Sequence, residues 1–225
     1  MNPLPARARA AARPPDASLP LAPSPLPART AWPTVGRCVL ATSGMLARRR
    51  IWQPTEHIGR TLRFADGTES RVYRETRVDR PEPTDPAVLI VAFRLRGVHG
   101  AGHTAFERES VLHTPLFAGF PGKVSKLWLA HDDRSVYRGL YEWDGPHLAD
   151  TYARSLWRVL ALVSEPGSID FRVLAGLGRD ELLADPVRTL GFAPLDPDSW
   201  WRLIGTDPPK VSLLRGRSRR AARGC

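Results

Sequence analysis

The sequence is poor in cysteine and contains no long hydrophobic run. Cys38 and Cys225 are its only cysteines, and both lie outside the regularly patterned middle of the chain. A disulfide framework or a cysteine-based zinc site is therefore excluded from that region. No stretch reaches the roughly 18 apolar residues of a spanning helix, and prolines interrupt the apolar segment 19–27, which disfavours a secretory signal. These absences favour the cytoplasm.

The middle of the chain also lacks excess positive charge. The formal net charge is +10, but residues 1–60 and 210–225 supply all of it, and residues 61–209 carry −3. A folded nucleic-acid-binding domain usually has a basic stripe of its own. Nucleic acid is therefore expected only as a weak, salt-sensitive partner of the basic tails.

Motifs of the common enzyme classes are missing as well. There is no G-x-S-x-G sequence, and the glycines of segment 97–102 match neither G-x-G-x-x-G nor the P-loop spacing. His99 and His103 flank glycines there and could share a metal, but no Asp, Glu or Cys stands at a matching ligand spacing. No metal and no cofactor is expected.

Composition and hydrophobic pattern divide the chain into four parts. The first is rich in Pro, Ala and Arg, cannot bury enough apolar surface to offset chain entropy, and is predicted to be disordered. The alternative is that translation begins later, at Met45. Asp66 and Gly67 form a typical hairpin turn in the second part. The predicted parts are a disordered leader (1–56), a β-hairpin extension (57–80), a folded domain with a C-terminal extension (86–206) and a basic disordered tail (207–225).

The folded part alternates between strand and helix periodicities. The patterns predict strands over 87–96, 123–131, 135–143 and 168–174, and helices over 104–117 and 146–163. This β-α-β-β-α-β order predicts a ferredoxin-like α+β sandwich, an antiparallel sheet with both helices on one face. A short helix over 180–190 and docking of Trp200 and Trp201 on the core are also expected.

The two middle strands are predicted to pair about Asp133. That register places Lys126 opposite Leu140 and Trp128 opposite Arg138. Lys126 and Trp128 then lie on the face away from the helices, among charged residues. A face that mixes apolar and charged side chains in this way is seldom left in water, so we expect the sheet of a second subunit to cover it.

Two strings of residues resemble those of a known family. They are segment 114–122 (TPLFAGFPG), which leads into 126–129 (KLWL), and segment 137–143 (YRGLYEW), which leads into the second helix. With the element order, they resemble the dimeric α/β-barrel superfamily, in particular proteins of the antibiotic-biosynthesis monooxygenase type, over about residues 86–178. The resemblance implies a homodimer with a ligand cleft in each subunit. For some members it also implies oxygenation of an aromatic polyketide-like or quinol substrate without metal or flavin.

The aromatic residues of the domain are candidate ligand contacts. They can line a cleft that stacks a flat aromatic compound, with a phenol bonding its oxygen, or they can simply fill a small core. His113, one helical turn after Glu109, is the candidate general base, although such a pair is also typical of a surface contact near a helix end. The candidate ligand contacts are Phe117, Tyr141, Trp143, Tyr152 and Trp157.

Three functional hypotheses follow. The first is a small-molecule binding protein that acts as a cofactor-independent monooxygenase on an aromatic compound. The second is a non-catalytic ligand-binding or dimerisation module of the same fold, which a cleft without a titratable group would favour. The third is a nucleic-acid-associated protein that works through its tails, for which a steep salt dependence would speak.

Overall fold

The computed structural model describes residues 24–109, 117–192 and 199–209. The helices are α1 (Ala28–Ala47), α2 (Ala101–Glu109), α3 (Pro146–Leu160), α4 (Arg179–Ala184) and the 3-10 helix η2 (Pro186–Gly191). The strands are β1 (Ile51–Trp52), β2 (Thr61–Phe64), β3 (Glu69–Val78), β4 (Pro86–Arg94), β5 (Lys123–Leu129), β6 (Val136–Asp144), β7 (Asp170–Ala175) and β8 (Leu203–Asp207). Among these residues, no helix has the length and apolar character that crossing a bilayer requires.

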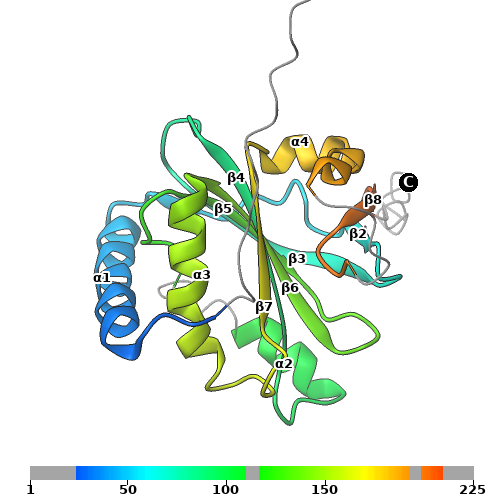
Figure 1. Cartoon of the computed structure of the whole chain (residues 1–225), viewed down its shortest axis with the longest axis horizontal. Helices are drawn as coiled ribbons and strands as arrows, with labels where there is room; N and C mark the ends of the chain where they lie inside the picture. Colours follow the sequence, from blue (N-terminus) through cyan, green and yellow to red (C-terminus); the bar gives the residue numbers. More distant parts are fainter. Residues whose placement is uncertain (1–23, 110–116, 193–198, 210–225) are drawn as a thin grey trace, which may run out of the picture.

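One eight-stranded antiparallel sheet organises the described chain. Its strands follow the order β7-β4-β6-β5-β3-β2-β8, and β1 pairs with β3 beside this path. The sheet curls so that β2 and β8 pack over its own face (Figure 1). Leu62 of β2 and Leu203 of β8 share a buried cluster with Ile90 of β4 and Leu140 of β6, which we call the barrel core. The sheet is therefore a half-barrel with its own interior.

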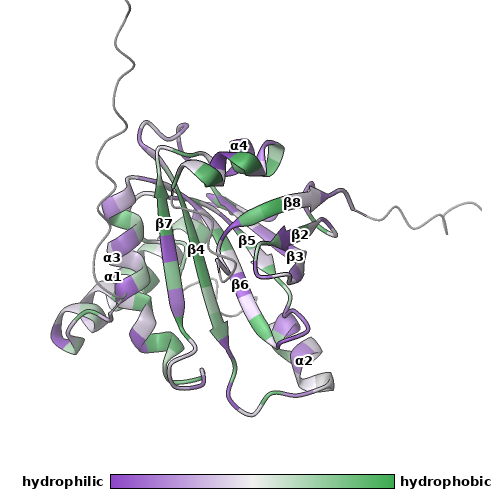
Figure 2. Cartoon of the chain, turned by 45° about the vertical axis from the view of Figure 1, so that its right-hand side comes forward, coloured by the Kyte–Doolittle hydropathy of each residue, from purple (hydrophilic) through white to green (hydrophobic). Residues whose placement is uncertain are grey.

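The opposite face of the sheet is covered by α3. Leu89 of β4 and Tyr141 of β6 pack there against Tyr152 and Leu156 of α3, in what we call the helix-side core. β4 lies between the two cores, and its residues 87–92 are buried throughout. Figure 2 shows this strand as almost continuously hydrophobic, as expected for a strand that is covered on both faces.

The predicted ferredoxin-like sandwich is wrong. The hairpin extension, expected to add to the main sheet or to pack beside it, adds to it, because β3 pairs with β5 and β2 pairs with β8. The sheet therefore has more strands than the ferredoxin-like fold provides. The two predicted helices do not form one layer either. α3 packs on the sheet, whereas α2 lies by the β5–β6 hairpin, where His103 contacts His131. Periodicity identifies the faces of a strand, but it does not identify the partner that the strand's edge takes.

The predicted disordered leader contains a helix. Residues 28–47 form α1, which packs beside α3 (Figure 1). The Leu26 N–H donates to the Arg154 carbonyl at 3.1 Å, and Arg158 Nε donates to the Leu26 carbonyl at 2.9 Å. The buried positions of α1 have helical spacing, which its Pro-, Ala- and Arg-rich surroundings obscured. They are Ala31, Val35, Cys38 and Thr42. Residues 1–23 and the tail 210–225 lie outside the described chain.

α1 approaches the rest of the molecule most closely at Gly119. A Cβ built there lies 2.3 Å from the Cys38 carbonyl oxygen and 2.6 Å from Thr42 Oγ1. Gly119→Ala should therefore push α1 off the core, lower the free energy of unfolding by about 1–3 kcal/mol and speed alkylation of Cys38 in a Cys225→Ser background. Gly191→Ala, which meets nothing within 4 Å, is the control. Equal melting temperatures and alkylation rates in both variants would contradict this packing.

The register of β5 differs by one residue from the prediction. Lys126 pairs with Tyr141 and Trp128 with Gly139. A slip of one residue moves every side chain of a strand to the other face, so Lys126 and Trp128 lie on the helix side of the sheet. The other strands follow the alternation that the strand period predicts. Leu89 of β4, Tyr141 of β6 and Phe171 and Val173 of β7 all face the helix-side core.

The turn between β5 and β6 explains the slip. The Ser135 N–H donates to the Asp132 carbonyl at 3.0 Å, and Ser135 itself has a φ of 60°. The turn is thus centred between Asp133 and Arg134, half a residue beyond the predicted centre. The carboxylate of Asp132 stabilises it by accepting from the N–H groups of Arg134 and Val136, both at 2.9 Å.

The face that was expected to need a second subunit is covered within the chain. Leu182 and Leu183 of α4 and the docked Trp201 pack on it as part of the barrel core, and the predicted docking of Trp201 is thereby confirmed. The homodimer stays a prediction. It was predicted because one face of the sheet was expected to be uncovered, and in the described residues that face is covered.

Candidate functional site

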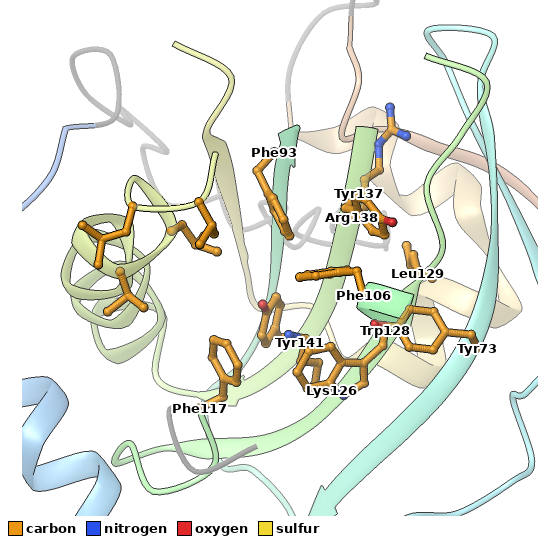
Figure 3. Close-up of a pocket in the computed structure, with 15 residues that line it drawn as sticks. Tyr73, Phe93, Phe106, Phe117, Lys126, Trp128, Leu129, Tyr137, Arg138 and Tyr141 are labelled. Carbon is orange, nitrogen blue, oxygen red and sulfur yellow. The ribbon is translucent and has the colours of Figure 1, made fainter. Parts of the chain in front are cut away.

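A cavity of about 160 Å³ opens between the helix side of the sheet and the end of α3. β3, β4, β5 and β6 form its floor, α2 contributes Phe106, and α3 contributes Val159 and Leu160 (Figure 3). Its size is close to that of engineered apolar cavities of about 150 Å³ that bind benzene. We call it the aromatic pocket, after its rings: Tyr73, Phe93, Phe106, Phe117, Trp128, Tyr137 and Tyr141.

The pleat of β5 and β6 places the floor residues. Lys126 and Trp128 alternate along β5, and Tyr137, Gly139 and Tyr141 alternate along β6, so all five lie on the same face. Gly139 makes room for the ring that crosses over it. A Cβ at this position would lie 2.6 Å from the Tyr141 ring. The glycine therefore sets both the position of Tyr141 and the depth of the pocket.

The rings hold one another by edge and stacking contacts. Phe117 meets Trp128 with centroids 5.4 Å apart at 82°, and Phe106 meets Tyr137 at 5.0 Å and 64°. Phe93 stacks on Tyr137 at 5.8 Å. Such arrangements are favourable for aromatic quadrupoles. These contacts fix the shape of the pocket walls, and one more flat ring can pack between them.

Lys126 brings an amine into this apolar pocket. Its Nζ lies 3.1 Å from the Trp128 ring centroid, 4.3 Å from that of Phe117 and 4.8 Å from that of Tyr141. Burial lowers the pKa of Lys126 well below its ordinary value, and the positive charges of Lys123 and Arg74 lower it further. The rings attract the ammonium form and offset only part of this effect. Near neutral pH the amine is therefore unprotonated far more often than that of an exposed lysine.

The polar groups around Lys126 are basic side chains and tyrosines. Arg74 Cζ lies 3.8 Å from the Trp128 ring centroid, and burial lowers the pKa of Arg74 to about 10. Lys123 Nζ lies 4.0 Å from the Tyr141 centroid, and burial lowers the pKa of Lys123 well below its ordinary value as well. Burial raises the pKa of Tyr137 and of Tyr141. Both tyrosines remain hydrogen-bond donors near neutral pH, so this environment favours a ligand with an electron-rich oxygen.

A histidine pair borders the pocket behind Tyr137. His103 Nδ1 lies 2.8 Å from the Tyr137 hydroxyl, and its ring stacks on that of His131 with centroids 3.8 Å apart. Burial lowers the pKa of His103, and the charges of His131 and His99 act in the same direction. Within the described ranges, no group of three or more His, Cys, Asp or Glu residues could hold a metal ion.

The predicted ligand contacts divide between pocket and core. Phe117 and Tyr141 line the pocket. Trp143 and Tyr152 are fully buried in the helix-side core, with ring centroids 4.8 Å apart. Trp157 is outside the pocket lining and packs edge-on against Phe171 at 6.2 Å. The predicted general base, His113, lies outside the described residues.

Several residues of the pocket were not predicted from the sequence. Lys126 and Trp128 were assigned to the opposite face, and a turn centred between Asp133 and Arg134 is the signal that would have placed them correctly. Tyr73 lies in the predicted hairpin extension and was not expected at the ligand site. It reaches the pocket because β3 joins the main sheet beside β5.

Comparisons of the chain with protein-family models, with curated proteins and with solved structures find no match. The resemblance to the dimeric α/β-barrel superfamily stays a prediction. A functional proposal therefore depends on the geometry and electrostatics of the aromatic pocket.

Proposed function

We propose that this protein binds a small aromatic compound in the aromatic pocket, with one flat ring between the aromatic walls and an oxygen substituent directed at Lys126. The observation that carries the proposal is the buried amine of Lys126 in a cavity lined mainly by rings and aliphatic side chains. Arg138 also lines the cavity, but its guanidinium donates to Asp132 and Asp66. Apolar pockets with a few convergent polar groups are typical small-molecule sites.

The volume of the pocket sets the class of compound. About 160 Å³ is enough for one ring with small substituents, such as a phenol or a hydroquinone. A polycyclic polyketide exceeds it. Among the compounds that the family resemblance implies, the pocket thus favours quinol-like ligands over polyketide-like ones.

Oxygenation without a cofactor is the enzymatic form of this proposal. It begins with removal of a proton from the phenolic hydroxyl, because the phenolate is the electron-rich form that reacts. An unprotonated Lys126 amine can accept that proton, and the positive charge of Arg74, whose pKa stays at about 10, would stabilise the phenolate. The alternative is a non-catalytic binding module, in which the same contacts hold a ligand without reaction.

Binding is tested by thermal unfolding of the full chain with phenol, hydroquinone and benzoate. A ligand at a hundred times its dissociation constant adds about 2.7 kcal/mol, which raises the melting temperature of a chain of this size by roughly 5–10 °C. Val159→Phe on α3 should fill the pocket and abolish the increase. No increase with any of these compounds would refute the proposal.

Leu148→Phe is the matched control, since Leu148 is an exposed residue of the same helix and does not line the pocket. It should keep the full increase. An equal increase in Val159→Phe and in the wild type would place the ligand elsewhere. Oxygen uptake in the presence of a stabilising phenol then separates the enzymatic form from the binding module.

A further inference from the structure

The described chain contains two lysines, Lys123 and Lys126, and both are buried on β5. The two amines differ in whether a small molecule in the pocket can reach them. Lys126 lines the aromatic pocket. The amine of Lys123 is sealed among Tyr141, Trp143 and Tyr152, and it has no hydrogen-bond partner in the described structure. Only one of these two amines can therefore meet a ligand.

The surroundings of Lys126 favour reaction at its nitrogen. An amine is a nucleophile only when it is unprotonated, and burial in an apolar site beside other cations is a known way to activate a lysine. Lys126 has both features, since it is 5% exposed and the charged groups that act on it are Lys123 and Arg74. Figure 3 shows the side chain beside Trp128 and Tyr141 at the base of the pocket.

We propose that Lys126 is a covalent site that forms an imine with a single-ring aromatic aldehyde or ketone held in the aromatic pocket. This inference rests on the proposed function, because the same walls position the ring. It adds a substrate class, aromatic carbonyl compounds, and a chemical role for one residue.

The reaction needs no oxidant or reductant. The lone pair of Nζ attacks the carbonyl carbon, a C–N bond forms, and a proton moves from nitrogen to the former carbonyl oxygen to give a carbinolamine. The hydroxyl leaves as water with one more proton, and the nitrogen lone pair closes the C=N bond to give an iminium ion. Loss of the remaining N–H proton to water then gives the imine and balances the proton taken up. Tyr141 pairs directly with Lys126 across the two strands and lines the same pocket. Because burial raises the pKa of Tyr141, its hydroxyl serves as a hydrogen-bond donor to the carbonyl oxygen, and solvent water supplies the proton for the leaving group.

The imine can be trapped on the full-length protein with benzaldehyde and sodium cyanoborohydride, which reduces the imine to a stable benzylamine. Peptide mapping then compares Lys126 with Lys123, Lys210 and the terminal amine. Lys126 should be modified at least about tenfold faster than Lys210 near neutral pH, because each unit by which a pKa falls raises the unprotonated fraction about tenfold. The preference should disappear in urea.

Two variants complete the test. Lys126→Met should lose the adduct at that position, and Lys123→Met should keep it. Modification of Lys126 no faster than of Lys210, while benzaldehyde still raises the melting temperature, would overturn the imine proposal and leave the binding pocket intact. Absence of both the adduct and the thermal increase would refute the pocket as well. The wild-type mapping remains decisive if either variant fails to fold.

Discussion

Arg138→Met is expected to lower the free energy of unfolding by about 3–5 kcal/mol, the usual cost of breaking a buried ion pair from one side. Arg138 Nη1 donates to Asp132 at 2.6 Å and Nη2 donates to Asp66 at 2.8 Å, while Nε donates to the Trp200 carbonyl at 3.3 Å. The side chains of Arg138 and Asp132 are 1% and 0% exposed. Methionine would leave Asp132 as a buried charge without its partner.

Arg138 lies where three segments of the chain meet above the barrel core. Asp132 belongs to the β5–β6 turn, Asp66 to the β2–β3 turn, and Trp200 to the segment before β8. One guanidinium therefore joins the three segments that bend over the barrel core. Arg138→Lys should recover part of the stability, because an ammonium can pair with one carboxylate but cannot reproduce the guanidinium's hydrogen bonds to two carboxylates and a carbonyl.

Urea unfolding followed by tryptophan fluorescence measures this effect. In a separate thermal unfolding experiment the melting temperature should fall by about 10 °C, given roughly 2–4 °C per kcal/mol for a chain of this length. Adding Asp132→Asn should restore part of the loss, since it removes the stranded charge. Arg188→Met is the control. Its ion pairs are more than half exposed on both sides, so it should cost less than about 1 kcal/mol. A similarly small loss for Arg138→Met would show that the network is not structural.

Arg179→Met is expected to cost about as much near pH 7, again roughly 3–5 kcal/mol. The guanidinium is fully buried at the start of α4, where Nη1 donates to Glu75 at 2.7 Å and to Ser125 at 2.9 Å. Glu75 lies on β3 and also accepts from His57 Nδ1 at 2.8 Å. The pair thus attaches α4 to the sheet. Its loss leaves a buried carboxylate with the His57 hydrogen bond and the more distant Arg77, whose Nε lies 3.7 Å from Glu75 Oε1.

The loss in Arg179→Met should depend on pH. Burial raises the pKa of Glu75, but the hydrogen bond from His57 and the charge of Arg179 outweigh burial and hold this pKa below its ordinary value. A carboxyl group with a lowered folded-state pKa stabilises the fold above its ordinary pKa, and this contribution disappears as pH falls through the folded-state pKa. Without Arg179 the effect of burial prevails, so the pKa of Glu75 should rise.

Urea unfolding of both proteins between about pH 7 and pH 4 checks the sign of this linkage. The difference in stability should be largest near pH 7 and should shrink as Glu75 takes up a proton in the variant. Glu75→Gln combined with Arg179→Met should remove the part of this pH dependence that comes from Glu75. A remainder should come from Asp180, because burial raises its pKa but the charge of Arg179 outweighs burial and holds this pKa below its ordinary value as well. A difference that stays constant across the range would show that the stranded carboxylate is not the cause.

Local elements of this protein could be predicted from local sequence. The hairpin turn at Asp66 and Gly67 is confirmed, since Gly67 has a φ of +80° and Asp66 accepts from the Thr68 N–H at 3.1 Å. α3 begins at Pro146 and presents Tyr152 and Leu156 to the core, as the helical period predicts. Each of these features depends on residues that are near one another in the chain.

The candidate site was only partly predictable. The aromatic composition pointed to rings around a cavity, and Phe117 and Tyr141 do line it. Trp143 and Tyr152 are also aromatic and also lie on the helix side of the sheet, but they are buried deeper, in the helix-side core. Whether an aromatic residue lines the pocket or fills the core depends on the distance between α3 and the sheet at that residue. The spacing of residues in the sequence does not determine this distance.

The sequence by itself determined which residues alternate along each strand and which helix faces are apolar, because these follow from the backbone periods of strand and helix. Only the tertiary structure decided the register of β5, the return of β8 over the sheet and the docking of α1. Those depend on contacts between distant segments and on the exact centre of one turn, at Asp133 and Arg134. The resulting difference of one residue in the register of β5 places Lys126 in the aromatic pocket, where both proposals place their chemistry.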